Sequence, residues 1–128
     1  MPILVPVSWG ELLDKITILE IKTRRIADPA KLDNVARELD ALRAVVVAAG
    51  DLPAAAQPLI DALVGVNEAL WDVEDEIRDC ERRKEFADRF VELARSVYHQ
   101  NDRRAALKRE LNDLLGSELV EEKSYQAY

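Results

Sequence analysis

Apolar residues recur along most of this chain at intervals of three and four positions, which is the period of an amphipathic helix. The first such stretch begins at Ser8 and Glu11, whose spacing matches a capping box and predicts a helix to about residue 27. Its apolar residues form one larger face, Trp9, Leu12, Leu13, Ile16, Leu19 and Ile26, and an opposite face, Ile18 and Ile21. A helix that is apolar on two sides is central to a fold or lies at an interface.

A second helix is predicted over residues 29–49. Asp28 and Pro29 supply the N-cap and the first-turn proline that commonly begin a helix, and Gly50 ends it. The segment GDLPAAAQP, 50–58, has the composition of a loop. Its length suits a turn between antiparallel helices.

Two longer helices are predicted in the C-terminal half. Helical phase continues over about 58–82, and a reversal is predicted at RRKE, 82–85, because one helix of about sixty residues would be exceptional. Phe86 opens the last helix, and Gly116 provides its C-terminal stop.

The path of the last helix through residues 98–103 has two interpretations. An unbroken helix puts Asn101, Arg104, Lys108 and Asn112 on the same face as the phenylalanine stripe that precedes them. Alternatively, Asn101 is the N-cap of a new helix with its own leucine stripe. We favour the unbroken helix, because only the capping preference of Asn and Asp would interrupt it.

These elements predict a single all-α domain over residues 1–128, an antiparallel bundle of about four helices with a long C-terminal helix. An extended N-terminal arm, 1–7, is expected to lie against the body, and a tail, 117–128, has few apolar residues with which to dock. A monomer is expected to leave four apolar residues exposed: Ile18, Ile21, Leu107 and Leu114. We therefore predict a homodimer.

The amino-acid composition argues against several classes of binding partner. The net charge of −7 argues against binding to nucleic acid or to an anionic membrane, since both require a cationic field. A single cysteine, Cys80, and a single histidine, His99, leave no internal disulfide and no Cys/His zinc site. No apolar stretch approaches the roughly 18 residues of a membrane span, and no signal peptide is recognised. We expect a cytoplasmic protein without a cofactor.

Polar residues interrupt the predicted core. The predicted inward set, with a tryptophan beside it, is Glu20, Arg43, Asn67, Trp71, Glu74, Arg78, Glu81, Asn101, Arg104, Lys108 and Asn112. Burying a charge costs several kcal/mol unless the charge is paired, so these groups should meet one another, water or a ligand. Two interpretations stay open: a closed network that fixes helix register, or a pocket for a small anionic molecule.

The candidate binding residues of such a pocket are Arg104, Lys108, Asn101, Asn112, Arg78, Asn67 and Trp71, with Arg104 and Lys108 as its cationic wall. The first functional hypothesis is a non-catalytic module that binds a partner protein or a small anionic ligand. The alternative is an enzyme in which Glu74 or Glu20 serves as acid or base. Three E-x-x-D pairs, Glu11/Asp14, Glu85/Asp88 and Glu110/Asp113, could suggest bound magnesium. Such pairs arise easily by chance among 25 acidic residues, and these lie at helix starts or on outer faces, so we assign no metal.

Four segments together carry a resemblance to a known family: VSWGELLDKITILEIK, LWDVEDEIR, ARSVYHQNDRRAALKREL and GSELVEEKSY. They resemble a family of short bacterial all-helical proteins catalogued as a domain of unknown function, over nearly the whole chain. The resemblance implies no activity, cofactor or catalytic residue. In architecture the chain also resembles the all-helical chorismate mutases, whose long helices place charged side chains inward around a dicarboxylate.

Overall fold

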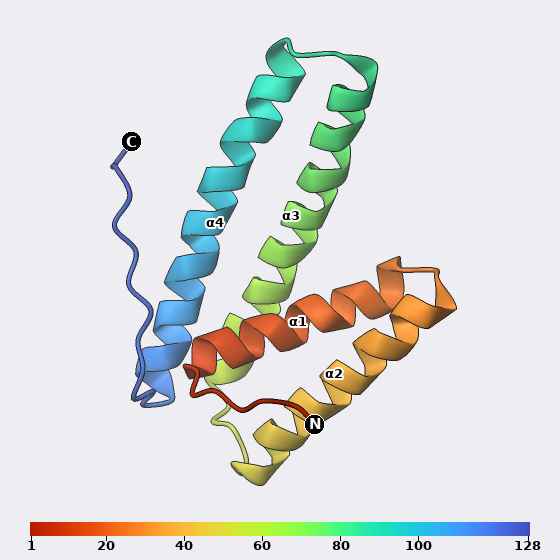
Figure 1. Cartoon of the computed structure of the whole chain (residues 1–128). Coiled ribbons are helices and arrows are strands. Elements are labelled where there is room, and N and C mark those ends of the chain that lie inside the picture. Colours follow the sequence, from red (N-terminus) through yellow and green to blue (C-terminus); the bar gives the residue numbers. More distant parts are fainter.

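The computed structural model describes all 128 residues and contains four helices and no strand (Figure 1). In chain order the helices are α1 (Trp9–Arg25), α2 (Pro29–Ala48), α3 (Ala56–Arg83) and α4 (Asp88–Leu114). The predicted all-α bundle of four helices with a long last helix is confirmed.

The helices form two antiparallel hairpins, α1 with α2 and α3 with α4 (Figure 1). The α1–α2 hairpin lies across the lower part of the longer α3–α4 hairpin. Helix α1 packs against all three other helices, whereas α2 packs against α1. This arrangement explains why α1 is apolar on two sides, because it is the central helix of the molecule.

Two apolar clusters meet at α1. The first joins α1 to α3 and α4 through Leu13, Ala56, Leu63, Val66, Leu107 and Leu111. The second joins α1 to α2 through Leu12, Ile16, Leu19, Val35 and Leu39. Each hairpin therefore has its own core, and α1 contributes to both.

The expectation of four exposed apolar residues is wrong for two of them. Ile21 and Leu107 are buried within the chain at 1% and 8% exposure, Ile18 is half-buried, and Leu114 is exposed. The reason is that the two hairpins cross. Helices α3 and α4 therefore cover a side of α1 that would be exposed to solvent if all four helices lay side by side. The homodimer stays a prediction, without these two residues to support it.

The ends of the helices follow the predicted signals with small differences. Helix α4 is continuous through 98–103, as favoured. Phe86 precedes α4 rather than opening it, and its exposed ring packs edge-on against Phe90. The reversal at 82–85 is confirmed, with Lys84 in the left-handed region at φ 58°. Residues 1–7 of the N-terminal arm have no helix or strand, and all seven are exposed to solvent.

No helix of the chain has the length and hydropathy that crossing a bilayer would require.

Candidate functional site

Asp14 is the centre of a buried polar network on α1. Its side chain is 2% exposed and accepts hydrogen bonds from Arg104, with Nη2 at 2.7 Å from Oδ2 and Nε at 3.1 Å from both carboxylate oxygens. Asn67 of α3 donates to Asp14 Oδ1 at 2.8 Å and to Thr17 Oγ1 at 3.0 Å. These four residues, the Asp14 network, connect α1, α3 and α4. Such charge-assisted bonds are stronger than neutral ones.

The Asp14 network also fixes the charge of Arg104. The hydrogen bonds that its guanidinium donates to Asp14 raise the pKa of Arg104, although its partial burial acts in the opposite direction. Because the fork of the guanidinium is held by one carboxylate, Arg104 behaves first as a structural residue of this chain.

Lys108 lies one helical turn further along α4 and is also buried, with a side chain 8% exposed. Its Nζ lies 2.7 Å from Glu11 Oε2, 2.7 Å from Glu121 Oε2 and 4.0 Å from Asp14 Oδ2. Burial opposes its charge, but hydrogen bonds to Glu11 and Glu121 outweigh that effect and raise the pKa of Lys108. The lysine is thus held charged by acids from α1 and from the tail.

The first amides of α1 are capped by side chains from both ends of the chain. Trp9 N donates to Ser117 Oγ at 2.9 Å, Gly10 N to Asn112 Oδ1 at 2.6 Å, and Glu11 N to Ser8 Oγ at 3.1 Å. The Ser8 half of the predicted capping box is confirmed. The Glu11 side chain instead binds Lys108, so the reciprocal half is replaced by a tertiary ion pair.

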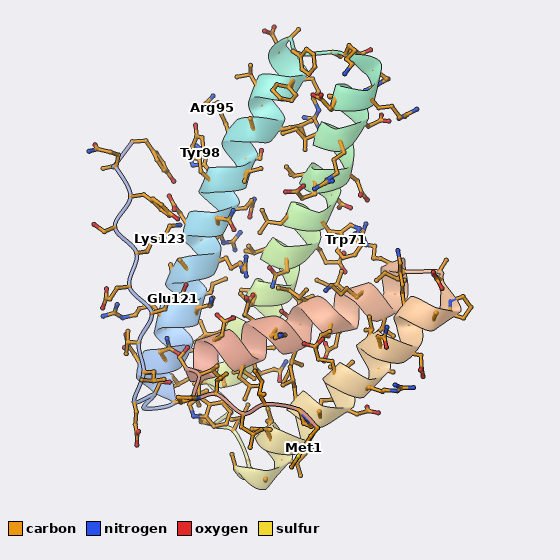
Figure 2. The ribbon with its side chains drawn as sticks, viewed as in Figure 1. Met1, Trp71, Arg95, Tyr98, Glu121 and Lys123 are labelled. Carbon is orange, nitrogen blue, oxygen red and sulfur yellow. The ribbon has the colours of Figure 1, made fainter.

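Six of the nine predicted site residues line one open pocket of about 470 Å³. This junction pocket lies where α1, α3 and α4 meet and is lined by Ile18, Ile21, Asn67, Leu70, Trp71, Glu74, Asp75, Arg78, Val97, Asn101 and Arg104. In Figure 2, Trp71 lies on α3 in the angle above α1. The apolar side chains and the polar groups of the pocket therefore come from three helices that the Asp14 network holds together.

The other three predicted residues lie elsewhere. Lys108 faces the tail, and Asn112 is buried as a cap of α1. Glu20 forms a partly exposed pair with Arg43, at 3.1 Å, on the α1–α2 hairpin. The prediction that Glu20 and Arg43 point into the core is wrong, because α2 packs against α1 alone and leaves this edge open.

Glu74, Arg78 and Glu81 were also predicted to point inward, and all three are exposed. Glu74 and Arg78 pair with each other along α3 at 3.2 Å, with side chains 53% and 79% exposed. Their face of α3 is covered by α1 only near Asn67 and Trp71, so beyond the crossing the same face meets solvent. Glu74 and Arg78 form the rim of the junction pocket, and Glu81 does not line it.

Asp14 was not among the residues predicted to point inward, yet it is buried at 1% exposure. The sequence does carry a signal for its burial: Asp14 stands four residues before Ile18 and seven before Ile21. That spacing puts it on the second apolar face of α1. The importance of Glu121 has no comparable local signal, because it lies in an irregular tail.

The tail runs back along α4 (Figure 1) and forms one wall of a second open pocket, of about 540 Å³. This tail pocket is lined by Asn101, Arg104, Ala105 and Lys108 of α4 and by residues 121–125. Beyond Ser117 the tail forms no backbone-to-backbone hydrogen bond. Side chains hold it through the pairs Glu121–Lys108, Glu122–Arg109, Lys123–Asp102 and Tyr128–Asp102.

Simple magnitudes indicate that the tail is weakly held. Ordering a residue costs about 1 kcal/mol of backbone entropy, and an exposed ion pair contributes at most about 1 kcal/mol. The tail has roughly three exposed polar contacts for about eleven ordered residues, and its leucine, valine and tyrosine side chains stay exposed. Among the ion pairs of the tail, the pair of Glu121 with Lys108 is the one whose partner is buried.

The remaining candidate groups have local roles. His99 is exposed, and its ring lies 4.8 Å from that of Tyr98 and 4.7 Å from that of Tyr128. Cys80 is a buried free thiol. No three His, Cys, Asp or Glu side chains come together in a way that could hold a metal ion.

No protein-family model matches the chain, and no curated protein or solved structure matches it either. Function therefore has to be inferred from the geometry of the chain itself.

Proposed function

We propose that the chain is a non-catalytic helical binding module whose junction pocket takes a small ligand with an acidic group and an apolar body. The observation that carries the proposal is the convergence of Asn101, Arg104, Arg78 and Trp71 on one open pocket of about 470 Å³. That volume lies within the usual range of small-molecule pockets, roughly 300–1,000 Å³.

The lining of the pocket matches both parts of such a ligand. Ile18, Leu70, Trp71 and Val97 offer apolar surface. Asp14 occupies Nε and Nη2 of Arg104, whereas Nη1 has only a long contact of 3.4 Å with Asn101 Oδ1. Since a guanidinium has five N–H donors, Arg104 keeps donors for a carboxylate or phosphate while it still binds Asp14.

A binding role is favoured over catalysis because the acid/base candidates lack a suitable environment. Glu20 does not line the junction pocket, and Glu74 lies exposed at its rim, paired with Arg78. An acid or base catalyst needs a pKa near neutral pH, and for a carboxyl group burial is the main cause of such a rise. Neither glutamate is buried.

Thermal shifts with a library of small carboxylates and phosphates test the proposal on wild type, Arg78→Ala and Trp71→Ala. A ligand at ten times its Kd adds about 1.4 kcal/mol to the free energy of unfolding. We expect the best compound to raise the Tm of wild type by about 5 °C, and both variants to lose most of that shift.

Arg43→Ala is the matched control, because Arg43 is also an exposed arginine paired with a glutamate but lies outside the pocket. It should keep the full shift. Arg104→Ala is a poor probe, because it removes the main partner of buried Asp14. A compound that stabilises Arg78→Ala and Trp71→Ala as much as wild type contradicts the proposal, and so does a library without any hit.

A further inference from the structure

The tail presents a carboxylate to a buried lysine in the way that a bound peptide would. Glu121 Oε2 lies 2.7 Å from Lys108 Nζ, at the tail pocket that Arg104 and Asn101 also line. The next tail residue, Glu122, pairs at 3.2 Å with Arg109, which follows Lys108 on α4. Figure 2 shows Glu121 and Lys123 on the tail segment that runs beside α4.

We propose that Lys108, with Arg104 beside it, is a carboxylate-binding site that Glu121 fills within the chain and that an acidic segment of a partner protein occupies by displacing the tail. The site shares Asn101 and Arg104 with the junction pocket, but Lys108, Glu121 and the rest of the tail lie outside that pocket, so the inference goes beyond the proposed function. The tail itself indicates the chemistry of the partner: an extended segment with two consecutive acids that meet Lys108 and Arg109.

Displacement of the tail disrupts little else. No backbone-to-backbone hydrogen bond anchors the tail beyond Ser117, and its apolar side chains Leu119, Val120, Tyr125 and Tyr128 are all exposed. Beyond Ser117, the other contacts of the tail lie at the surface: the ion pairs of Glu122 and Lys123, and Tyr128, whose hydroxyl donates to Asp102 and whose ring lies beside those of Tyr98 and His99. A segment that supplies an equivalent carboxylate can therefore replace it without unpacking either core.

When the tail is displaced, the Lys108 ammonium group loses one of its carboxylate acceptors. The group is buried and has three N–H donors. Glu11 accepts from it, whereas Asp14 lies 4.0 Å away and is held by Arg104. Loss of Glu121 leaves a donor of a buried cation facing the tail pocket, which is costly unless another acceptor arrives.

Competition with a peptide in trans tests this inference on the full chain. The probe is a fluorescently labelled synthetic peptide, SELVEEKSYQAY, that copies residues 117–128, and binding is measured by fluorescence anisotropy. In wild type the attached tail acts at millimolar effective concentration and excludes the probe. We expect the Glu121→Gln chain to bind the probe at least tenfold more tightly than wild type does.

Two matched controls isolate the carboxylate. Glu118→Gln makes the same change of charge in the same tail, at a residue without an ion pair, and should bind the probe like wild type. A probe with Gln in place of the glutamate equivalent to Glu121 should bind the Glu121→Gln chain at least tenfold more weakly than the original probe. Both measurements use the folded chain of 128 residues.

Equal affinity of wild type and Glu121→Gln for the probe overturns the inference, as does the absence of binding to Glu121→Gln. If free glutarate displaces the probe as effectively as unlabelled peptide does, the site binds a small dicarboxylate, and the inference of a partner segment is wrong. Trp71→Ala, combined with Glu121→Gln, should leave probe binding unchanged, so that failure here and failure of the junction pocket are told apart.

Discussion

Asp14 and Glu20 are carboxylates of the same helix, both paired with an arginine, and they differ in burial. Asp14 is almost fully enclosed with Arg104, whereas Glu20 and Arg43 are each more than a third exposed. Removing one partner of a buried pair leaves an uncompensated charge, whereas an exposed pair contributes little because water solvates both groups. Burial, not the presence of an ion pair, decides which acid matters to stability.

Asp14→Asn is therefore expected to lower the free energy of unfolding by about 3 kcal/mol, the lower end of the range for a broken buried pair, because Arg104 retains some contact with solvent. Glu20→Gln is the matched change at an exposed pair and should lower it by at most about 1 kcal/mol. Urea denaturation followed by circular dichroism measures both. Equal losses from the two substitutions would show that the Asp14 network has no special role.

At the scale of elements, the start of α1 is held against α4 by close backbone approach. A Cβ at Gly10 would lie 2.5 Å from the backbone oxygen of Lys108 and 2.9 Å from Asn112 Oδ1. Only glycine permits this distance, because the obstructing atom belongs to the backbone and cannot rotate away. The amide bond from Gly10 to Asn112 depends on the same approach.

Gly10→Ala is expected to destabilise the chain by about 2 kcal/mol, since overpacking forces α1 and α4 apart. Gly65→Ala is the matched control within α3, where an added Cβ meets no atom within 4 Å. It should stabilise the chain by about 0.5–1 kcal/mol through helix propensity alone. Thermal unfolding measures the Tm of both variants. A shift of Tm in the same direction for both would contradict this explanation of Gly10.

At the scale of the whole molecule, exposed ion pairs make the free energy of unfolding depend on pH in the acidic range. Hydrogen bonds from Arg25 lower the pKa of Glu68, those from Arg82 lower that of Asp79, and those from Lys123 lower that of Asp102. The folded chain thus binds fewer protons than the unfolded chain near these pKa values. The resulting stability is present above the ordinary carboxyl pKa and is lost as pH falls through the lowered values.

Urea midpoints measured from pH 6 to pH 3 should fall once the pH passes below about 4.5, the ordinary glutamate value. The fall should be smaller in 1 M NaCl, because salt screens exposed pairs. A midpoint that does not change over this range would contradict a contribution from these carboxylates.

The association of the whole molecule is open to a direct test. The sequence predicts a homodimer, although Ile21 and Leu107, two of the residues behind that prediction, are buried within one chain. The exposed apolar residues that remain include Ile3, Leu4 and Val5 of the N-terminal arm. Gel filtration with light scattering at micromolar concentration should give twice the mass of one chain if the prediction holds, and a monomer would refute it.

The helices and their ends could be predicted because their signals are local. Ser8 and Asp28 cap α1 and α2 through their own side chains, and the helical period continues through 98–103 without a residue that breaks it. The inward positions of Arg104, Lys108, Asn67 and Asn112 also followed from phase, since these residues lie in the part of α3 and α4 that α1 covers.

The crossing of the two hairpins could not be predicted in this way, and it decided the site. Helical phase states which residues share a face, but not how far along the helix a neighbour covers that face. Asn67, Glu74 and Arg78 share one face of α3, and only Asn67 lies under α1. The burial of Asp14 and its pairing with Arg104 follow from the same crossing, because the packing of α1 against α4 brings together two residues that are 90 positions apart in the sequence.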